Sequence, residues 1–155
     1  MSNRTKIAGA YIGAAVIGLC ALSAFPAMAA DNIYMLSIAD TLASSRAEGK
    51  LDDTVKFYFG ATPHPAVLRS FGDFMTNEKT NSVFKSDHKS CSWVFLSAVM
   101  KLQERAHKLG ANAVINIHSF YDKVDLSNDT QVPCHVGAIV AGIALKGDFV
   151  TVAGP

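Results

Sequence analysis

The chain has 155 residues, of which 50% are hydrophobic and 17% are charged, and its formal net charge at pH 7 is +1. A charge this close to zero, without a basic cluster, creates no long-range field to attract nucleic acid or an anionic surface. These values argue against a nucleic-acid-binding protein and fit one domain of ordinary size.

The first thirty residues have the order of a secretory signal peptide. Arg4 and Lys6 precede an apolar run over residues 8–25, and a small-x-small site ends at Ala29. We expect cleavage between Ala29 and Ala30. Removal of residues 1–29 would leave residues 30–155 as a single domain with a net charge near −1, in the periplasm or outside the cell.

A membrane anchor is the rival interpretation of this segment. The run is rich in glycine and alanine rather than leucine, and Pro26 interrupts it just before the cleavage site, which favours a signal peptide. Lipid attachment at Cys20 would need a small residue before it, whereas Leu19 precedes it. We therefore expect no stable membrane insertion after cleavage.

Loss of the leader would leave two cysteines, Cys91 and Cys134. Two cysteines in an oxidising compartment most simply form one disulfide. A redox-active thiol pair is the alternative, but the chain has no C-x-x-C spacing to support it.

The N-terminal half of the domain mixes weak helix and strand signals. Val55 and the aromatic residues after it favour a strand that ends at Gly60, and Gly72 marks a possible bulge in the next strand. In chain order we expect a short helix over 31–51, a strand over 55–59, a loop over 62–65, a strand over 67–75, and a long polar loop or irregular hairpin over 76–89.

The C-terminal half gives clearer patterns. Apolar residues at steps of four and three predict a helix over 92–109, and Gly110 follows where a left-handed cap would lie. We expect strands over 111–121 and 136–145, with a short edge strand over 149–152. In the first of these, alternation places Ala113, Ile115 and Ile117 on one face, and Asn116 and His118 on the other.

These elements predict an α+β domain in which one long helix packs on a small, mainly antiparallel sheet. The strand over 136–145 is apolar on both faces, and such a strand is covered on both sides. The helix is one cover, and a second layer or another subunit would be the other. Self-association into a homo-oligomer is therefore one expectation.

The run from Cys91 onward resembles a known family. Cys91 opens a predicted helix, Leu109-Gly110-Ala111-Asn112-Ala113-Val114 follows it, and Cys134 precedes Gly142-Ile143-Ala144-Leu145. This pattern, over residues 91–147, is similar to the Rcs stress-sensing outer-membrane lipoproteins of enteric bacteria and to the YbjQ-like small domains that carry a heavy-metal-binding label. The N-terminal half resembles small secreted proteobacterial proteins, some of which carry an excinuclease-ATPase label.

The resemblance implies that Cys91 and Cys134 correspond to one structural disulfide of the stress sensor. The sensor's second bridge is missing here, because Val140 occupies one of its positions and Ser119 or Phe120 the other. The sensor's lipid anchor is missing as well, which argues against a direct signalling role. The ATPase label has no support, since the chain contains no G-x-x-x-x-G-K-[ST] phosphate loop.

A metal site is the sharpest chemical alternative. His118 and His135 lie on adjacent predicted strands, and with Asp122 and Cys134 they could bind a soft metal. No tight pair of ligands supports the geometry, and surface roles for these histidines are the simpler interpretation. We expect no cofactor and no catalytic residues, because neither a G-x-S-x-G elbow nor a cysteine–histidine pair that survives disulfide formation is present.

The sequence thus predicts an exported, non-enzymatic envelope protein that acts through contact with another envelope protein or with itself, in a stress-related setting. The alternative is a periplasmic protein that binds a metal or a small ligand through His118 and His135.

Overall fold

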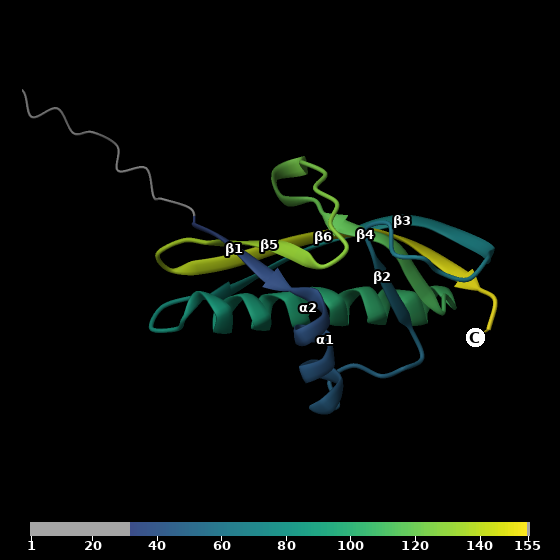
Figure 1. Cartoon of the computed structure of the whole chain (residues 1–155), viewed down its shortest axis with the longest axis horizontal. Coiled ribbons are helices and arrows are strands. Elements are labelled where there is room, and N and C mark those ends of the chain that lie inside the picture. The colour runs from purple at the N-terminus through teal and green to yellow at the C-terminus, as the bar shows by residue number, and fades with distance from the viewer. Residues whose placement is uncertain (1–31, 155) are drawn as a thin grey trace, which may run out of the picture.

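The computed structural model describes residues 32–154, so the predicted signal peptide and its cleavage site at Ala29 and Ala30 lie outside the described residues. The elements are shown in Figure 1. In chain order they are β1 (Asn32–Ser37), α1 (Ile38–Ala47), β2 (Lys56–Phe59), β3 (Val67–Asn81), α2 (Asp87–Leu109), β4 (Ala113–Ser119), the 3-10 turn η1 (Tyr121–Lys123), β5 (Gln131–Val136) and β6 (Val140–Val152).

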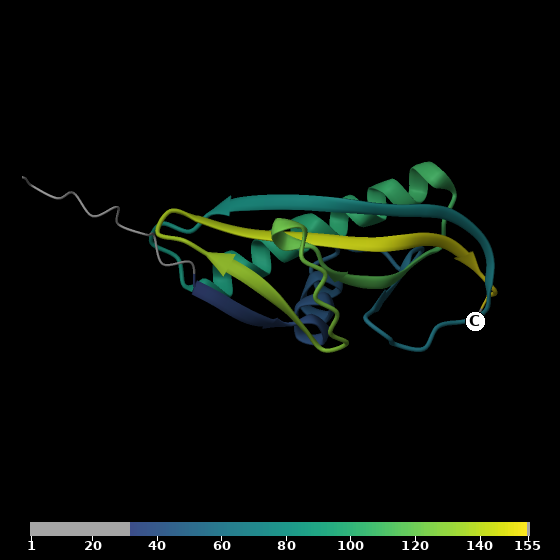
Figure 2. The ribbon, with the colours of Figure 1, turned by 90° about the horizontal axis from the view of Figure 1, so that it is seen from above.

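The six strands form one mixed sheet around β6. Strands β5 and β4 pair with successive parts of one edge of β6, and β3 pairs with its other edge along nearly the whole length. All pairs are antiparallel except β2 with β4. Figure 2 shows β3 and β6 running side by side along the molecule. The α+β class is confirmed, but the sheet is larger than the small one that we expected.

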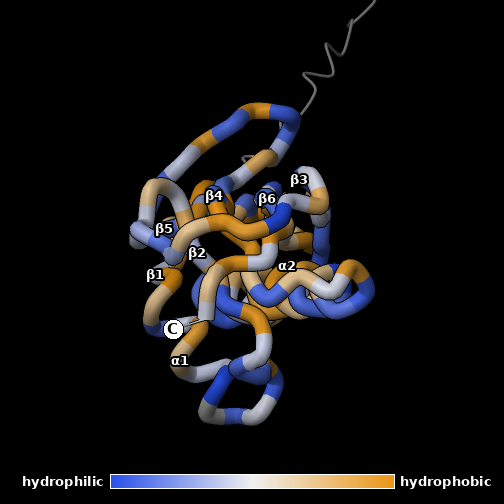
Figure 3. Tube along the Cα trace, turned by 90° about the vertical axis from the view of Figure 1, so that its right-hand side faces the viewer, coloured by the Kyte–Doolittle hydropathy of each residue, from blue (hydrophilic) through white to orange (hydrophobic). Residues whose placement is uncertain are grey.

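Helix α2 covers one face of this sheet, and η1 stands on the opposite, outer face (Figure 1). Figure 3 looks along the long axis, with hydrophobic residues gathered where the strands face α2. A second helix, α1, also packs against α2, so the predicted architecture of one long helix on a sheet is incomplete. The largest fully buried side chains include Phe95, Phe149, Leu102, Ile117, Ile143 and Leu145.

The predicted helix over 31–51 is partly wrong, because its first residues form β1. Ser37 ends the strand and caps α1, with its hydroxyl accepting from the Asp40 N–H. Strand β1 pairs with β5, which lies about a hundred residues later in the chain. Long-range pairing of this kind overrides the weak local helix pattern.

Strand β3 is longer than predicted. The bulge at Gly72 is confirmed, since the register with β6 shifts between Ser70 and Asp73 and Gly72 has φ +92°. Residues 76–81, expected in a loop, continue the strand. Helix α2 begins at Asp87, earlier than predicted, because Ser86 caps it and its first turn is polar. Gly110 adopts the predicted left-handed cap.

A bulge in β4 makes the predicted alternation wrong. Asn116 has φ +52°, a conformation that asparagine tolerates better than most residues. Ile117 therefore lies in the main core beside α2, whereas Ala113 and Ile115 belong to a small cluster with Val150 and Val152. The bulge shifts the register against β6 between Ile115 and His118.

The predicted strand over 136–145 is also wrong, because a turn divides it. The Gly137 N–H donates to the Val140 carbonyl oxygen at 2.8 Å, which ends β5 and begins β6. Ala138 and Ile139 lie in this turn and are exposed. Residues 140–145 do form a strand, as the start of β6, and residues 141–145 are buried on both faces of the sheet. These faces are already covered within the described chain, so the expectation of self-association loses that support. The predicted edge strand over 149–152 is the end of central β6.

We expect Gly147→Ala to lower the free energy of unfolding by about 1–3 kcal/mol through overpacking. Gly147 lies opposite the β4 bulge, where an added Cβ would be 2.9 Å from Val114 Cγ1 and 3.1 Å from Ile117 Cγ1. Gly142→Ala in the same strand is the matched control, since its Cβ would meet no atom closer than 3.4 Å. Urea unfolding measures both, and equal effects at the two sites would contradict the packing argument.

Candidate binding groove beside the edge strand

The predicted disulfide is present. Cys91 near the start of α2 is bonded to Cys134 in β5, and both residues are fully buried. The bond fixes the first turns of the helix to the sheet. A structural disulfide is typical of compartments outside the cytosol. Among residues 32–154, no helix is both long and apolar enough to span a bilayer.

His118 points to the outer face and is held at both ring nitrogens. Its Nδ1 lies 2.7 Å from the Asn116 carbonyl oxygen, and its Nε2 lies 2.8 Å from Asp125 Oδ1. Both neighbours are acceptors, so both contacts are hydrogen bonds only when each ring nitrogen carries a proton. A cation at Nε2 would have to share or displace the Asp125 carboxylate.

His135 is not beside His118. The partners of the two histidines on β6, Gly142 and Lys146, are four residues apart, which is about 13 Å along a strand. The His135 ring stacks on Tyr121, with centroids 3.6 Å apart. Cys134 is bonded to Cys91, so its sulfur cannot act as a thiolate ligand for a metal. In the described part of the chain, no group of three or more His, Cys, Asp or Glu side chains could hold a metal.

A charged pair lies on the outer face beside His118. Lys146 Nζ lies 3.0 Å from Asp73 Oδ2, and this hydrogen bond lowers the pKa of Asp73 and raises the pKa of Lys146. Lys146 also lies over the Phe120 ring. The pair joins β3 to β6, which is a structural role.

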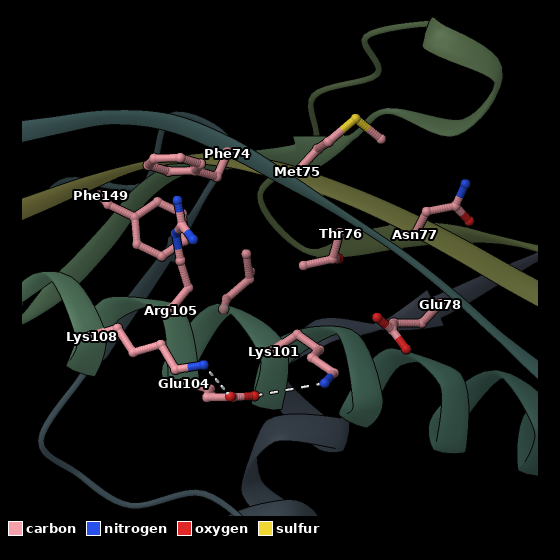
Figure 4. Close-up of a pocket in the computed structure, with 11 residues that line it drawn as sticks. Phe74, Met75, Thr76, Asn77, Glu78, Lys101, Glu104, Arg105, Lys108 and Phe149 are labelled. Atoms are coloured by element: carbon pink, nitrogen blue, oxygen red, sulfur yellow. Dashed lines mark hydrogen bonds and ion pairs between the residues drawn. The ribbon is translucent and has the colours of Figure 1, made fainter.

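The main hollow of interest is a groove of about 440 Å³ on the other face, between β3 and α2 (Figure 4). Its floor is apolar, because Phe149 is fully buried and Phe74 packs against it edge to face. Its lining residues are Phe74, Met75, Thr76, Asn77, Glu78, Lys101, Leu102, Glu104, Arg105, Lys108 and Phe149.

The groove offers one cation and one hydroxyl that have no polar partner. Glu104 accepts from Lys108 at 2.6 Å and lies 3.7 Å from Lys101, contacts that lower its pKa. Arg105 instead lies over the Phe74 ring, 4.1 Å from its centroid, and no carboxylate within residues 32–154 pairs with it. Thr76 Oγ1 is buried without a hydrogen-bond partner. A ligand that supplies a hydrogen-bond partner would remove the free-energy cost of leaving this hydroxyl unpaired.

Strand β3 borders the groove with a free backbone edge. The Ser82 N–H donates to the Ile139 carbonyl, so in this antiparallel ladder the even-numbered residues of β3 bond to β6. The backbone N–H and C=O groups of Met75, Asn77 and Lys79 therefore point away from β6, in the plane of the sheet and toward its free edge. Within the described residues, β3 pairs with β6 alone. A row of unpaired donors and acceptors is a template for another strand.

No pattern in the sequence indicates this groove. The segment Thr76–Asn81 is polar, so it gave no hydrophobic alternation, and its only strand signal was β-branched Thr76 and Thr80 four residues apart.

Comparisons with known proteins add no relative, since no family model, curated protein or solved structure matches the chain.

Proposed function

We propose that this protein is an exported, non-enzymatic envelope protein that binds an extended segment of a partner protein along β3. The free edge of β3 beside the groove carries this proposal. An added strand would pair with Met75, Asn77 and Lys79, and its alternate side chains would lie in the groove over α2.

The side chains of the groove define the chemistry of the partner segment. An acidic side chain would pair with Arg105, an apolar one would cover Phe74, and a polar one would satisfy the Thr76 hydroxyl. The disulfide supports a site outside the cytosol, and we place it in the periplasm or beyond, after removal of the leader. The resemblance to the Rcs stress sensors makes envelope stress the setting that we propose.

We expect Asn77→Pro to abolish partner binding with little loss of stability. The Asn77 N–H points to the free edge, so proline there removes no bond to β6, and edge strands tolerate it. Glu78→Pro is the matched control, because its N–H bonds to β6 and the loss of this ladder hydrogen bond should lower the free energy of unfolding by about 1–3 kcal/mol. Thermal unfolding of the two variants tests the assignment of the edge.

The partner is found by placing a photo-crosslinking amino acid at Asn77 in the cells that export the protein. The same amino acid at exposed Ala43 in α1 is the control. Once the partner segment is known, adding it should slow amide exchange at Met75, Asn77 and Lys79 and leave α1 unchanged. Binding that leaves these amides unprotected, or that survives Asn77→Pro, would refute strand addition.

The alternative, a periplasmic protein that binds a metal or small ligand, has less support. It rests on the His118–Asp125 pair alone, since His135 lies about 13 Å away along the strand direction. Saturable zinc uptake that is lost in His118→Ala would favour this alternative over the groove.

A further inference from the structure

An apolar tip projects from the end of the molecule opposite the C-terminus. The β3–α2 turn contributes Val83 and Phe84, the β5–β6 turn contributes Ile139, and Val140 follows it as the first residue of β6. Both turns lie at the same end in Figures 1 and 2. The Phe84 side chain is fully exposed, and Ile139 and Val140 are 66% and 40% exposed. Apolar exposure of this extent at a protruding end suggests contact with something apolar.

The backbone at Phe84 is strained to present this ring. The Lys85 N–H donates to the Ser82 carbonyl oxygen at 3.1 Å, which makes Phe84 the third residue of a β-turn. Its φ is +58°, at a turn position that glycine or asparagine usually fills. A bulky side chain there costs stability and buries nothing in the protein. An outlier of this kind points to a function outside the fold.

The two turns form one unit. The Ser82 N–H donates to the Ile139 carbonyl at 3.0 Å, and the Ser82 hydroxyl donates to the Gly137 carbonyl at 3.1 Å. These bonds keep Phe84 and Ile139 on a common, convex end. A protruding end can insert into the fluid interface of a lipid bilayer, whereas a protein partner would need a cavity of matching shape.

The whole chain creates no long-range field, but the segment next to the tip carries a small local excess of positive charge, which acts on an anionic surface only at contact distance. Residues 78–89 contain three lysines, Lys79, Lys85 and Lys89, against two carboxylates, Glu78 and Asp87. Apolar and aromatic side chains flanked by lysines are typical of segments that bind at the membrane interface.

The chain also enters the fold at this end. Asn32 pairs with Val136, the residue before the β5–β6 turn, so residues 1–31 join the domain beside the tip.

We propose that the tip formed by Val83, Phe84, Ile139 and Val140 inserts shallowly and reversibly into the surface of an anionic phospholipid bilayer. The contact is interfacial and does not span the membrane. It leaves the groove between β3 and α2 open along the side of the molecule, and it does not depend on the strand-addition proposal.

The test uses the protein in the processed form that the cells export, with an environment-sensitive dye on a cysteine introduced as Ile139→Cys. The control carries the dye at Ser70→Cys, an exposed site near the start of β3, toward the other end of the molecule. With phosphatidylglycerol vesicles, we expect the dye at residue 139 to shift to shorter wavelength and to be quenched by brominated acyl chains. The dye at residue 70 should do neither, and phosphatidylcholine vesicles should bind less protein.

Phe84→Asn should then weaken vesicle binding about tenfold, because the variant lacks the aromatic side chain that would be buried in the bilayer surface. Asparagine accepts positive φ, so this variant should melt no lower than the parent protein. Val124→Asn, at another exposed apolar site, on the outer-face loop, is the control and should bind vesicles normally.

Three results would overturn the proposal. One is equal dye behaviour at residues 139 and 70, and another is unchanged vesicle binding by Phe84→Asn. The third is shielding of the dye at residue 139 that rises with protein concentration without vesicles, which would assign the tip to contact with a second copy.

Discussion

Loss of the Cys91–Cys134 bond should lower the free energy of unfolding by about 4 kcal/mol, the value that chain entropy gives for a cross-link between residues 43 apart. Single domains are stable by about 5–15 kcal/mol, so this loss would remove a large share of the total. The double variant Cys91→Ala, Cys134→Ala and the reduced parent protein should both show it in urea unfolding.

The controls follow from the burial of the bond. Both cysteines are fully buried, so reductant should act slowly on the folded protein and rapidly once urea opens it. Reductant should leave the double variant unchanged, and neither cysteine should react with a thiol label until the bond is reduced. If the urea midpoint of the parent protein is the same with and without reductant, the bond contributes nothing to stability.

The elements that could be predicted from the sequence are those that their own residues specify. The α2 pattern of apolar residues at steps of four and three places Phe95, Val99 and Leu102 in the core, as expected. Gly110 ends the helix in the predicted conformation. The disulfide was predictable because residues 30–155 contain only two cysteines, Cys91 and Cys134.

The errors lie where distant pairing decides the structure. Strand β1 forms because β5 pairs with it, and no local pattern contains that information. The β5–β6 turn was hidden because Ala138 and Ile139 are apolar, although Gly137 marked it. The β4 bulge moves Ile117 to the opposite face from Ile115, and the only local sign was an asparagine at residue 116.

The groove was unpredictable for the same reason. Its cation, Arg105, and the ring below it, Phe74, lie 31 residues apart and meet only because β3 crosses α2. The histidines show the reverse case. Adjacent predicted strands suggested that His118 and His135 could meet, but β4 and β5 pair with different parts of β6 and hold them apart.

Phe149→Ala should lower the free energy of unfolding by about 3–5 kcal/mol, because it empties a fully buried site in β6, the central strand of the sheet. The same change should weaken partner binding, since Phe149 supports Phe74 from below and Phe74 supports the Arg105 guanidinium.

Met75→Ala is the control for stability, because Met75 is exposed on β3 and its replacement should lower the free energy of unfolding by less than about 0.5 kcal/mol. Phe149→Leu retains most of the volume, so it should keep a folded groove and separate loss of binding from loss of fold. Urea unfolding and titration with the partner segment measure the two effects. A cost below about 1 kcal/mol for Phe149→Ala would mean that this ring is not the packed floor on which the groove depends.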